Sequence, residues 1–239
     1  MNILDNVTES QKEAITHRDG SLLVIAGAGS GKTRVITRRI GYLIEKGVAP
    51  HNILAITFTN KAANEMKVRL NQFLDQKGVW VSTFHTMCAR ILRSEIELLG
   101  YSRHFTIYDT SDQVSCIRSV MNELNLDTTN WRPSSLAGTI SNAKSELISH
   151  EEFSEYKSGF YNTIVAKVYA GYQKSLEANN ALDFDDLLFK VAQLFKEQPQ
   201  VLEKYQDKFR YILIDEYQDT NHAQYTITRL LAQRYENIC

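Results

Sequence analysis

The chain has 239 residues, a net charge of −1 and a hydrophobic content of 43%, with 27 Lys and Arg against 28 Asp and Glu. This apolar content supports a packed core and excludes an intrinsically disordered chain, and the balanced charge excludes a globally basic nucleic-acid-binding protein. The cysteines Cys88, Cys116 and Cys239 are odd in number and lack metal-ligand spacing, so we expect buried thiols in a reducing cytoplasm rather than disulfides or a zinc site.

The first predicted element is a continuous apolar run, residues 22–26, that ends in a glycine-rich turn. Such a run indicates a buried strand of a parallel sheet. It is too short to cross a bilayer and no signal peptide precedes it, so we expect a cytoplasmic protein with no membrane partner. After the turn, apolar residues at helical spacing predict a helix that ends at Gly47.

Two further strand–helix pairs follow. Residues 53–58 form a second apolar run, and Asn60 is positioned to cap the helix after it. Residues 79–81 predict a third strand, which leads into an amphipathic helix that ends at Gly100. Strands that alternate with helices at this spacing indicate an α/β fold with an open parallel sheet.

The pattern changes after about residue 109. From there to about residue 207 the sequence predicts helix after helix and no convincing strand, and residues 211–214 then return to a buried-strand pattern. The simplest architecture is an α/β domain interrupted by a mostly helical insertion.

The glycine-rich turn has the composition and context of a phosphate-binding loop. It consists of Ala26, Gly27, Ala28, Gly29, Ser30, Gly31, Lys32 and Thr33. Its glycines let backbone N–H groups surround a phosphate, and the following helix N-terminus adds positive charge. Lys32 can reach the β- and γ-phosphates of ATP, and Thr33 can offer its hydroxyl to Mg²⁺. Because Ala26 replaces the first glycine of the general pattern, a chance glycine turn is the alternative interpretation.

Two carboxylates, Asp215 and Glu216, follow the returning strand. A P-loop NTPase needs such a strand beside the phosphate strand, and its terminal Asp holds the Mg²⁺ that Thr33 also contacts. Glu216 is then placed to orient and deprotonate the attacking water. The pair alone could be a solvated acidic turn. Together with the loop it predicts one ATP–Mg²⁺ site with Lys32 and Glu216 as catalytic residues.

Several segments together resemble the motifs of superfamily 1 DNA helicases of the UvrD/Rep/PcrA type, and most closely those of the PcrA branch. In that family alanine is usual at the first loop position. The order and spacing agree from about residue 4 to the last residue. The segments are residues 26–33 for motif I, 56–63 for motif Ia, 82–85 for motif Ib, 215–220 (DEYQDT) for motif II, 182–187 (LDFDDL), and Gln11 for the adenine-reading Q motif.

The resemblance implies a RecA-like ATP-binding domain 1A, formed by residues 1–85 and 208–239 and incomplete at its C-terminal end, with residues 86–207 as the helical domain 1B. It implies ATP-driven 3′→5′ translocation on single-stranded DNA and unwinding of duplex, with ATP and Mg²⁺ as cofactors and partial-duplex DNA as a further substrate. It also implies a downstream second RecA-like domain, so we expect this part alone to bind nucleotide but hydrolyse it poorly. Repair or replication-initiation proteins are the implied protein partners.

The resemblance places DNA contacts after the second and third strands, at Phe58, Thr59, Asn60, Thr83, Phe84 and His85. Aromatic rings stack on bases of single strands, and hydroxyl or amide groups hold the backbone. The residues alone favour a core position under the sheet for each Phe and a hydrogen-bonded structural role for His85. Arg34 adjoins Thr33 and is a candidate for the nucleotide site, although the helix with Arg34, Arg38 and Arg39 is also interpretable as a solvated basic face.

Three other functions remain open at this stage. One is a self-contained P-loop kinase or ATPase, for which the chain shows no arginine-rich lid segment. Another is a non-catalytic module that binds DNA or a protein partner and keeps a vestigial nucleotide site. The third is a helicase–nuclease relative whose nuclease carboxylates would lie downstream.

Overall fold

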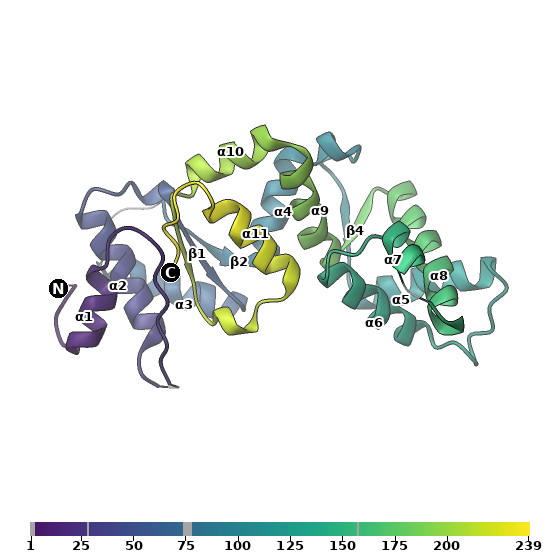
Figure 1. The fold of residues 1–239 in the computed structure, drawn as a ribbon, viewed down its shortest axis with the longest axis horizontal. Coiled ribbons are helices and arrows are strands. Elements are labelled where there is room, and N and C mark those ends of the chain that lie inside the picture. The colour runs from purple at the N-terminus through teal and green to yellow at the C-terminus, as the bar shows by residue number, and fades with distance from the viewer. Residues whose placement is uncertain (1–2, 28, 74–77, 157) are drawn as a thin grey trace. The chain divides into compact units, whose positions relative to one another are not determined.

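The computed structural model describes residues 3–27, 29–73, 78–156 and 158–239, and the chain divides into two compact units. The first unit comprises Met1–Met87, Gln198–Thr220 and Thr228–Cys239, and the second comprises Cys88–Glu197 and Asn221–Ile227. Both units contain parallel strands and helices (Figure 1). The predicted α/β class is therefore confirmed. Among the described helices, none is long and apolar enough to cross a membrane.

The first unit is built on a parallel three-stranded sheet in the order β2-β1-β5. Its strands are β1 (Ile53–Thr57), β2 (Trp80–Thr83) and β5 (Tyr211–Ile214). All five residues of β1 are buried, as expected for a central strand covered on both faces. Ala55 pairs with Val81 on one side and with Leu213 on the other, so β5 returns beside the second predicted strand.

Helices pack on this sheet through apolar stripes at helical spacing. Ile36, Ile40 and Leu43 of α2 join Ala63 and Met66 of α3 in one core with the sheet residues. The helical elements of this unit are α1 (Glu9–Thr16), α2 (Lys32–Glu45), η1 (Pro50–Asn52), α3 (Asn60–Phe73), α10 (Pro199–Lys208) and η3 (Tyr217–Asp219). Two helices, α4 (Phe84–Glu95) and α11 (His222–Ala232), have residues in both units.

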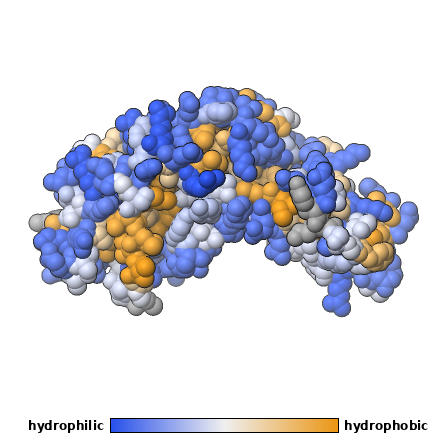
Figure 2. All heavy atoms as spheres, in the orientation of Figure 1, coloured by the Kyte–Doolittle hydropathy of each residue, from blue (hydrophilic) through white to orange (hydrophobic). Residues whose placement is uncertain are grey.

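The predicted first strand is wrong, because residues 21–27 form no regular strand. Leu22 N donates to Ile238 O at 2.8 Å, and Ile238 forms a parallel bridge with Ile212 of β5. The end of the chain therefore lies between this segment and β5, which do not pair directly as we expected. Leu23 and Ile25 are 75% and 89% exposed. Figure 2 shows hydrophobic atoms gathered on the surface where the segment between α1 and α2 runs.

The second unit is mainly helical, but it contains two short strands that the sequence does not predict, one just before residue 109 and one within residues 109–207. The strands β3 (Thr106–Tyr108) and β4 (Ala181–Asp183) pair in parallel. Three residues are too few for a periodic pattern, which explains why the sequence did not reveal β4. The helical elements are η2 (Ile96–Leu99), α5 (Thr110–Glu123), α6 (Pro133–Ser145), α7 (His150–Tyr156), α8 (Phe160–Ala178) and α9 (Phe184–Glu197).

A buried ionic cluster stands beside the core of the second unit. Lys144 Nζ lies 2.8 Å from Asp183 Oδ2 and 2.8 Å from Asp186 Oδ1, and the three side chains are at most 3% exposed. The hydroxyl of Tyr172 donates to Asp183 Oδ2 at 2.9 Å. Burial raises the pKa of Asp183, but the Lys144 charge and the hydrogen bonds outweigh burial and hold it below its usual value. Burial and the Asp183 charge raise the pKa of Asp186 to about 6.

Candidate nucleotide and DNA site

The phosphate loop adopts backbone conformations that favour glycine. Gly29 and Gly31 have φ angles of 75° and 87°, in the left-handed region. Gly31 is the N-cap of α2 and offers no side chain, so the first backbone N–H groups of the helix can face an anion. Ser30 Oγ donates to Gly27 O at 2.7 Å and closes the turn. Ala28, a predicted loop residue, lies outside the described residues.

The loop and the acidic pair meet, although 182 positions separate them along the chain. Thr33 Oγ1 donates to Asp215 Oδ2 at 2.8 Å. Lys32 Nζ lies 3.6 Å from Glu216 Oε1 and donates to Ala26 O at 3.3 Å. The Lys32 and Glu216 side chains are 28% and 41% exposed, so this ion pair is accessible to a ligand.

The sheet sets the position of the two carboxylates. Asp215 follows the last residue of β5, its backbone N donates to Ile56 O at 2.9 Å, and the residue is 6% exposed. Glu216 then turns the chain with a φ of 54°, a conformation that non-glycine residues rarely adopt and that clusters at functional sites. Gln218 Nε2 donates to Glu216 Oε2 at 2.6 Å. This contact was not predicted, and the DEYQDT segment was its only sequence signal.

The oxygen atoms of Thr33 and Asp215 fit a magnesium ion. A hydroxyl and one carboxylate within hydrogen-bonding distance are hard oxygen donors. Mg²⁺ typically takes one or two such protein ligands and completes its shell with phosphate oxygens and water. Within the described ranges, no group of three or more His, Cys, Asp or Glu is arranged around a metal site.

Gln11 contacts the loop directly. Its Nε2 donates to Ser30 O at 3.0 Å, and its Oε1 accepts a hydrogen bond from Thr8 N at 3.1 Å in the capping box of α1. The same side chain thus joins the start of α1 to the phosphate loop.

Two of the three arginines on the basic helix face, Arg38 and Arg39, are buried, in contrast to the interpretation of a solvated face. Arg38 and Arg39 are 6% and 2% exposed, and they donate to Ile3 O at 3.0 Å and to Ala14 O at 3.2 Å. Burial lowers the pKa of both guanidinium groups. Arg34 is exposed and donates to Asn6 O. These arginines attach the N-terminal segment to α2, a role that depends on backbone carbonyls and leaves no trace in the sequence.

The two candidate stacking rings differ in exposure. Phe58 is half-buried after β1, and Phe84 is 2% exposed at the start of α4. Their rings pack edge to face with centroids 6.0 Å apart. Of these two rings, Phe58 is the one with surface available to a base.

The polar candidates cap the helices that follow the strands. Thr59 Oγ1 accepts from Ala62 N at 3.1 Å, so Thr59 and not Asn60 caps α3, one residue earlier than predicted. Thr83 Oγ1 accepts from Thr86 N at 3.2 Å in the same way at α4. Thr59 and Asn60 are exposed, whereas Thr83 is buried. His85 is half-buried, and burial lowers its pKa.

Comparisons with known proteins agree with the motifs. A family model for the UvrD/REP helicase N-terminal domain matches residues 7–239. The chain is 54% identical to the ATP-dependent DNA helicase PcrA of Bacillus subtilis, over 99% of this chain and 32% of that protein. It is 50% identical to PcrA of Staphylococcus epidermidis and 49% identical to PcrA of Staphylococcus aureus, in each case over 99% of this chain and 33% of the relative.

These matches confirm the resemblance that the motifs indicated. The chain spans about a third of the length of the curated relatives it matches. It contains a phosphate loop joined to a carboxylate pair in an α/β fold with parallel strands, and it belongs to the UvrD/REP helicase family.

Proposed function

We propose that this chain is the ATP-binding part of an ATP-dependent DNA helicase that moves 3′→5′ along single-stranded DNA and unwinds duplex. The contact between Thr33 and Asp215 carries the proposal, because it joins the phosphate loop and the acidic pair into one site. Family membership and the names of the PcrA relatives support the use of ATP and DNA.

In this proposal the loop N–H groups and Lys32 bind the β- and γ-phosphates, while Thr33 and Asp215 hold Mg²⁺. The bound ion supplies neutralisation of phosphate charge. When ATP binds, Lys32 leaves Glu216 and contacts the phosphates, because a triphosphate carries more negative charge than one carboxylate. Glu216 is then free to orient the attacking water and accept its proton. Gln218 holds the second Glu216 oxygen and fixes the direction of the carboxylate.

Gln11 is the proposed contact to the adenine base. Arg34 follows Thr33 in the sequence and is a further candidate for the nucleotide site.

The DNA part of the proposal rests on residues that follow β1 and β2. Phe58 stacks on a base, since its ring has exposed surface. Thr59 and Asn60 contact the DNA backbone from the start of α3, and Thr83 and His85 do so from the start of α4. The proposed substrates are single-stranded and partial-duplex DNA.

A second RecA-like domain is the proposed partner that completes the catalytic site, in keeping with the threefold greater length of the relatives. Arginines supplied by a partner domain raise the turnover of related NTPases by about 10³–10⁵. We therefore expect the 239-residue chain to bind Mg·ATP and hydrolyse it slowly.

Steady-state ATP hydrolysis by the 239-residue chain, with and without single-stranded DNA, tests this assignment. We expect turnover at least about 10³-fold below that of a two-domain helicase, because the arginines of the partner domain are absent from the assay. The Glu216→Gln variant should remove the residual activity, and Glu203→Gln on α10 is the matched control. Full helicase-like turnover by the 239-residue chain would show that no partner domain is needed.

A further inference from the structure

The strand β1 ends in a buried polar residue. Its first four residues, 53–56, are apolar, and Thr57 follows them with only 1% of its surface exposed. A buried strand position favours a β-branched apolar side chain such as valine, and a buried hydroxyl is costly unless it forms a hydrogen bond. The side chain has no surface for a DNA contact of its own, so its hydroxyl acts inside the protein.

The Thr57 hydroxyl connects β1 to the helix that follows it. Thr57 Oγ1 donates to Thr59 O at 3.2 Å. The same carbonyl also accepts from Ala63 N at 3.0 Å, in the first turn of α3. A carbonyl oxygen has two lone pairs, so it can accept both hydrogen bonds at once. Thr59 is therefore held by the strand on one side and by the helix on the other.

Phe58 is the one residue between these two fixed points. The backbone of Thr57 pairs with Thr83 of β2 in the sheet, and Thr59 caps α3. The Phe58 ring packs edge to face against Phe84, with centroids 6.0 Å apart. The hydrogen bonds and the ring contact together restrict the backbone and the ring of Phe58, while part of the ring surface stays accessible.

A ring that is already oriented binds a base better than a mobile ring. Binding costs less when a side chain does not have to be ordered in the same step. Stacking of bases on aromatic side chains is also a main source of affinity for single strands. Loss of the Thr57 hydroxyl would release the Thr59 carbonyl from the strand and give the Phe58 turn more conformations. Base stacking on Phe58 would then become weaker.

We propose that Thr57 is a positioning residue for base stacking, because its hydroxyl holds the turn that carries Phe58 in the arrangement that single-stranded DNA needs. Thr57 acts through Phe58 and touches no DNA. The inference rests on the proposed stacking role of Phe58, so its test includes variants of both residues.

Single-stranded DNA binding by the Thr57→Val variant tests the proposal. Valine keeps the β-branched shape, and Thr59 O keeps its hydrogen bond from Ala63 N, so no acceptor is left unpaired and thermal stability should change little. We expect the affinity for a labelled oligothymidine, measured by fluorescence anisotropy, to fall by about threefold to tenfold, the range of one neutral hydrogen bond. Thr57→Ser keeps the hydroxyl and should bind within about twofold of the parent.

An oligomer of abasic sites distinguishes stacking from a general change of the fold. It presents the same phosphates without bases, so the parent and Thr57→Val should bind it equally. In the Phe58→Ala background, Thr57→Val should cause no further loss of oligothymidine affinity, since the ring through which Thr57 acts is gone. A purely structural role would weaken binding to both oligomers and in both backgrounds.

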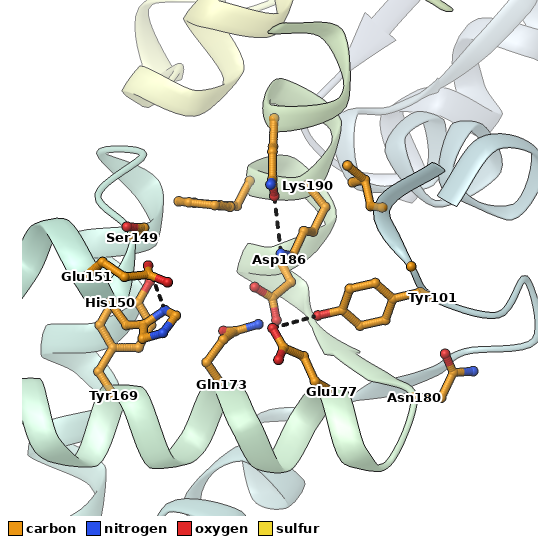
Figure 3. Close-up of a pocket in the computed structure, with 14 residues that line it drawn as sticks. Tyr101, Ser149, His150, Glu151, Tyr169, Gln173, Glu177, Asn180, Asp186 and Lys190 are labelled. Atoms are coloured by element: carbon orange, nitrogen blue, oxygen red, sulfur yellow. Dashed lines mark hydrogen bonds and ion pairs between the residues drawn. The ribbon is translucent and has the colours of Figure 1, made fainter. Parts of the chain in front are cut away.

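Two other buried residues with hydroxyl groups provide matched controls. Thr37, on α2, is 2% exposed and donates to Arg34 O at 3.0 Å, so Thr37→Val removes a similar hydrogen bond. Tyr101 lies in the second unit beside a cavity of about 450 Å³, where its hydroxyl contacts Glu177 and Gln173 (Figure 3). Tyr101→Phe should lower thermal stability, because it removes the hydroxyl partner of these side chains. Both controls should bind oligothymidine as the parent does.

The proposal is overturned if Thr57→Val binds oligothymidine as the parent does while Phe58→Ala binds it more weakly. It is also overturned if Thr57→Val loses as much affinity for the abasic oligomer, if its loss persists in the Phe58→Ala background, or if Thr57→Ser binds as weakly as Thr57→Val. Failure of the proposed DNA contact gives a different result. In that case the parent does not bind oligothymidine, or Phe58→Ala binds it as the parent does, and the positioning role of Thr57 is excluded together with the stacking role of Phe58.

Discussion

Two lysines among the described residues, Lys144 and Lys32, form ion pairs with carboxylates in very different surroundings. Lys144 lies 2.8 Å from both Asp183 and Asp186, in a cluster at most 3% exposed. Lys32 lies 3.6 Å from Glu216, with side chains 28% and 41% exposed, and the neighbouring Asp215 bonds to Thr33 instead.

This difference in burial and distance distinguishes charged groups that maintain the fold from charged groups that are free to contact a ligand. In the buried cluster every charge has a short contact, so loss of one partner leaves an uncompensated charge in a poorly solvated place. In the open group the ion pair is long and reachable, so a ligand can displace it at little cost. The same residue types therefore hold one unit together and, in the proposed function, leave the other able to exchange its ion pair for phosphate.

The largest expected effect is on the buried cluster. Lys144→Met should lower the free energy of unfolding by about 3–5 kcal/mol, because it strands two carboxylates. Urea unfolding followed by circular dichroism measures it. Lys167→Met, on the exposed face of α8, is the matched control and should change stability by less than about 0.5 kcal/mol. Addition of Asp186→Asn to Lys144→Met should recover part of the loss. A loss below about 1 kcal/mol for Lys144→Met would contradict the structural role of the cluster.

The next largest effect is expected when Phe58 and Phe84, the two rings that follow β1 and β2, are replaced one at a time. Phe84→Ala should cost about 3–5 kcal/mol of stability, since its ring is 2% exposed. Phe58→Ala should cost less stability and weaken single-stranded DNA binding by about 1–3 kcal/mol, the usual contribution of base stacking. Urea unfolding and fluorescence anisotropy with a labelled oligothymidine measure the two quantities. Equal DNA affinity in Phe58→Ala and the parent would exclude Phe58 as the stacking ring.

A smaller effect is expected in the phosphate loop. Gly31 has a φ of 87°, so Gly31→Ala should destabilise the chain by about 1–2 kcal/mol. Gly138, within α6, has open space where a Cβ would stand and no left-handed φ, so Gly138→Ala should stabilise the chain by about 0.4–1 kcal/mol. Thermal unfolding compares the two variants directly. The same sign for both changes would show that backbone conformation does not decide the cost.

Local patterns predicted most strands of the first unit and the two segments that the structure brings together at the candidate site. Short apolar runs predict the strands at residues 53–58, 79–81 and 211–214. The candidate site residues of the phosphate loop are consecutive in sequence, and so are those of the DEYQDT segment. These features depend on neighbours in sequence, which a pattern can capture.

Features that depend on distant partners were missed. Residues 22–26 have the pattern of a strand, yet their pairing depends on Ile238, more than 200 residues away. Arg38 and Arg39 have the pattern of surface charges, yet backbone carbonyls of the N-terminal segment bury them. The residues around Lys144 do not indicate its buried ion pairs, because its partners lie 39 or more positions further along the chain. A periodic pattern reports which face of an element is apolar, and it does not report what covers that face.

Titration of Mg·ATP into the parent chain and the Lys32→Ala variant tests the central claim most directly, with Lys61→Ala on α3 as a matched control. We predict saturable, Mg²⁺-dependent binding by the parent and the control, at least about tenfold weaker binding by Lys32→Ala, and stability of Lys32→Ala within about 0.5 kcal/mol of the parent. Equal affinity of Lys32→Ala and the parent for Mg·ATP would contradict the assignment of the phosphate loop.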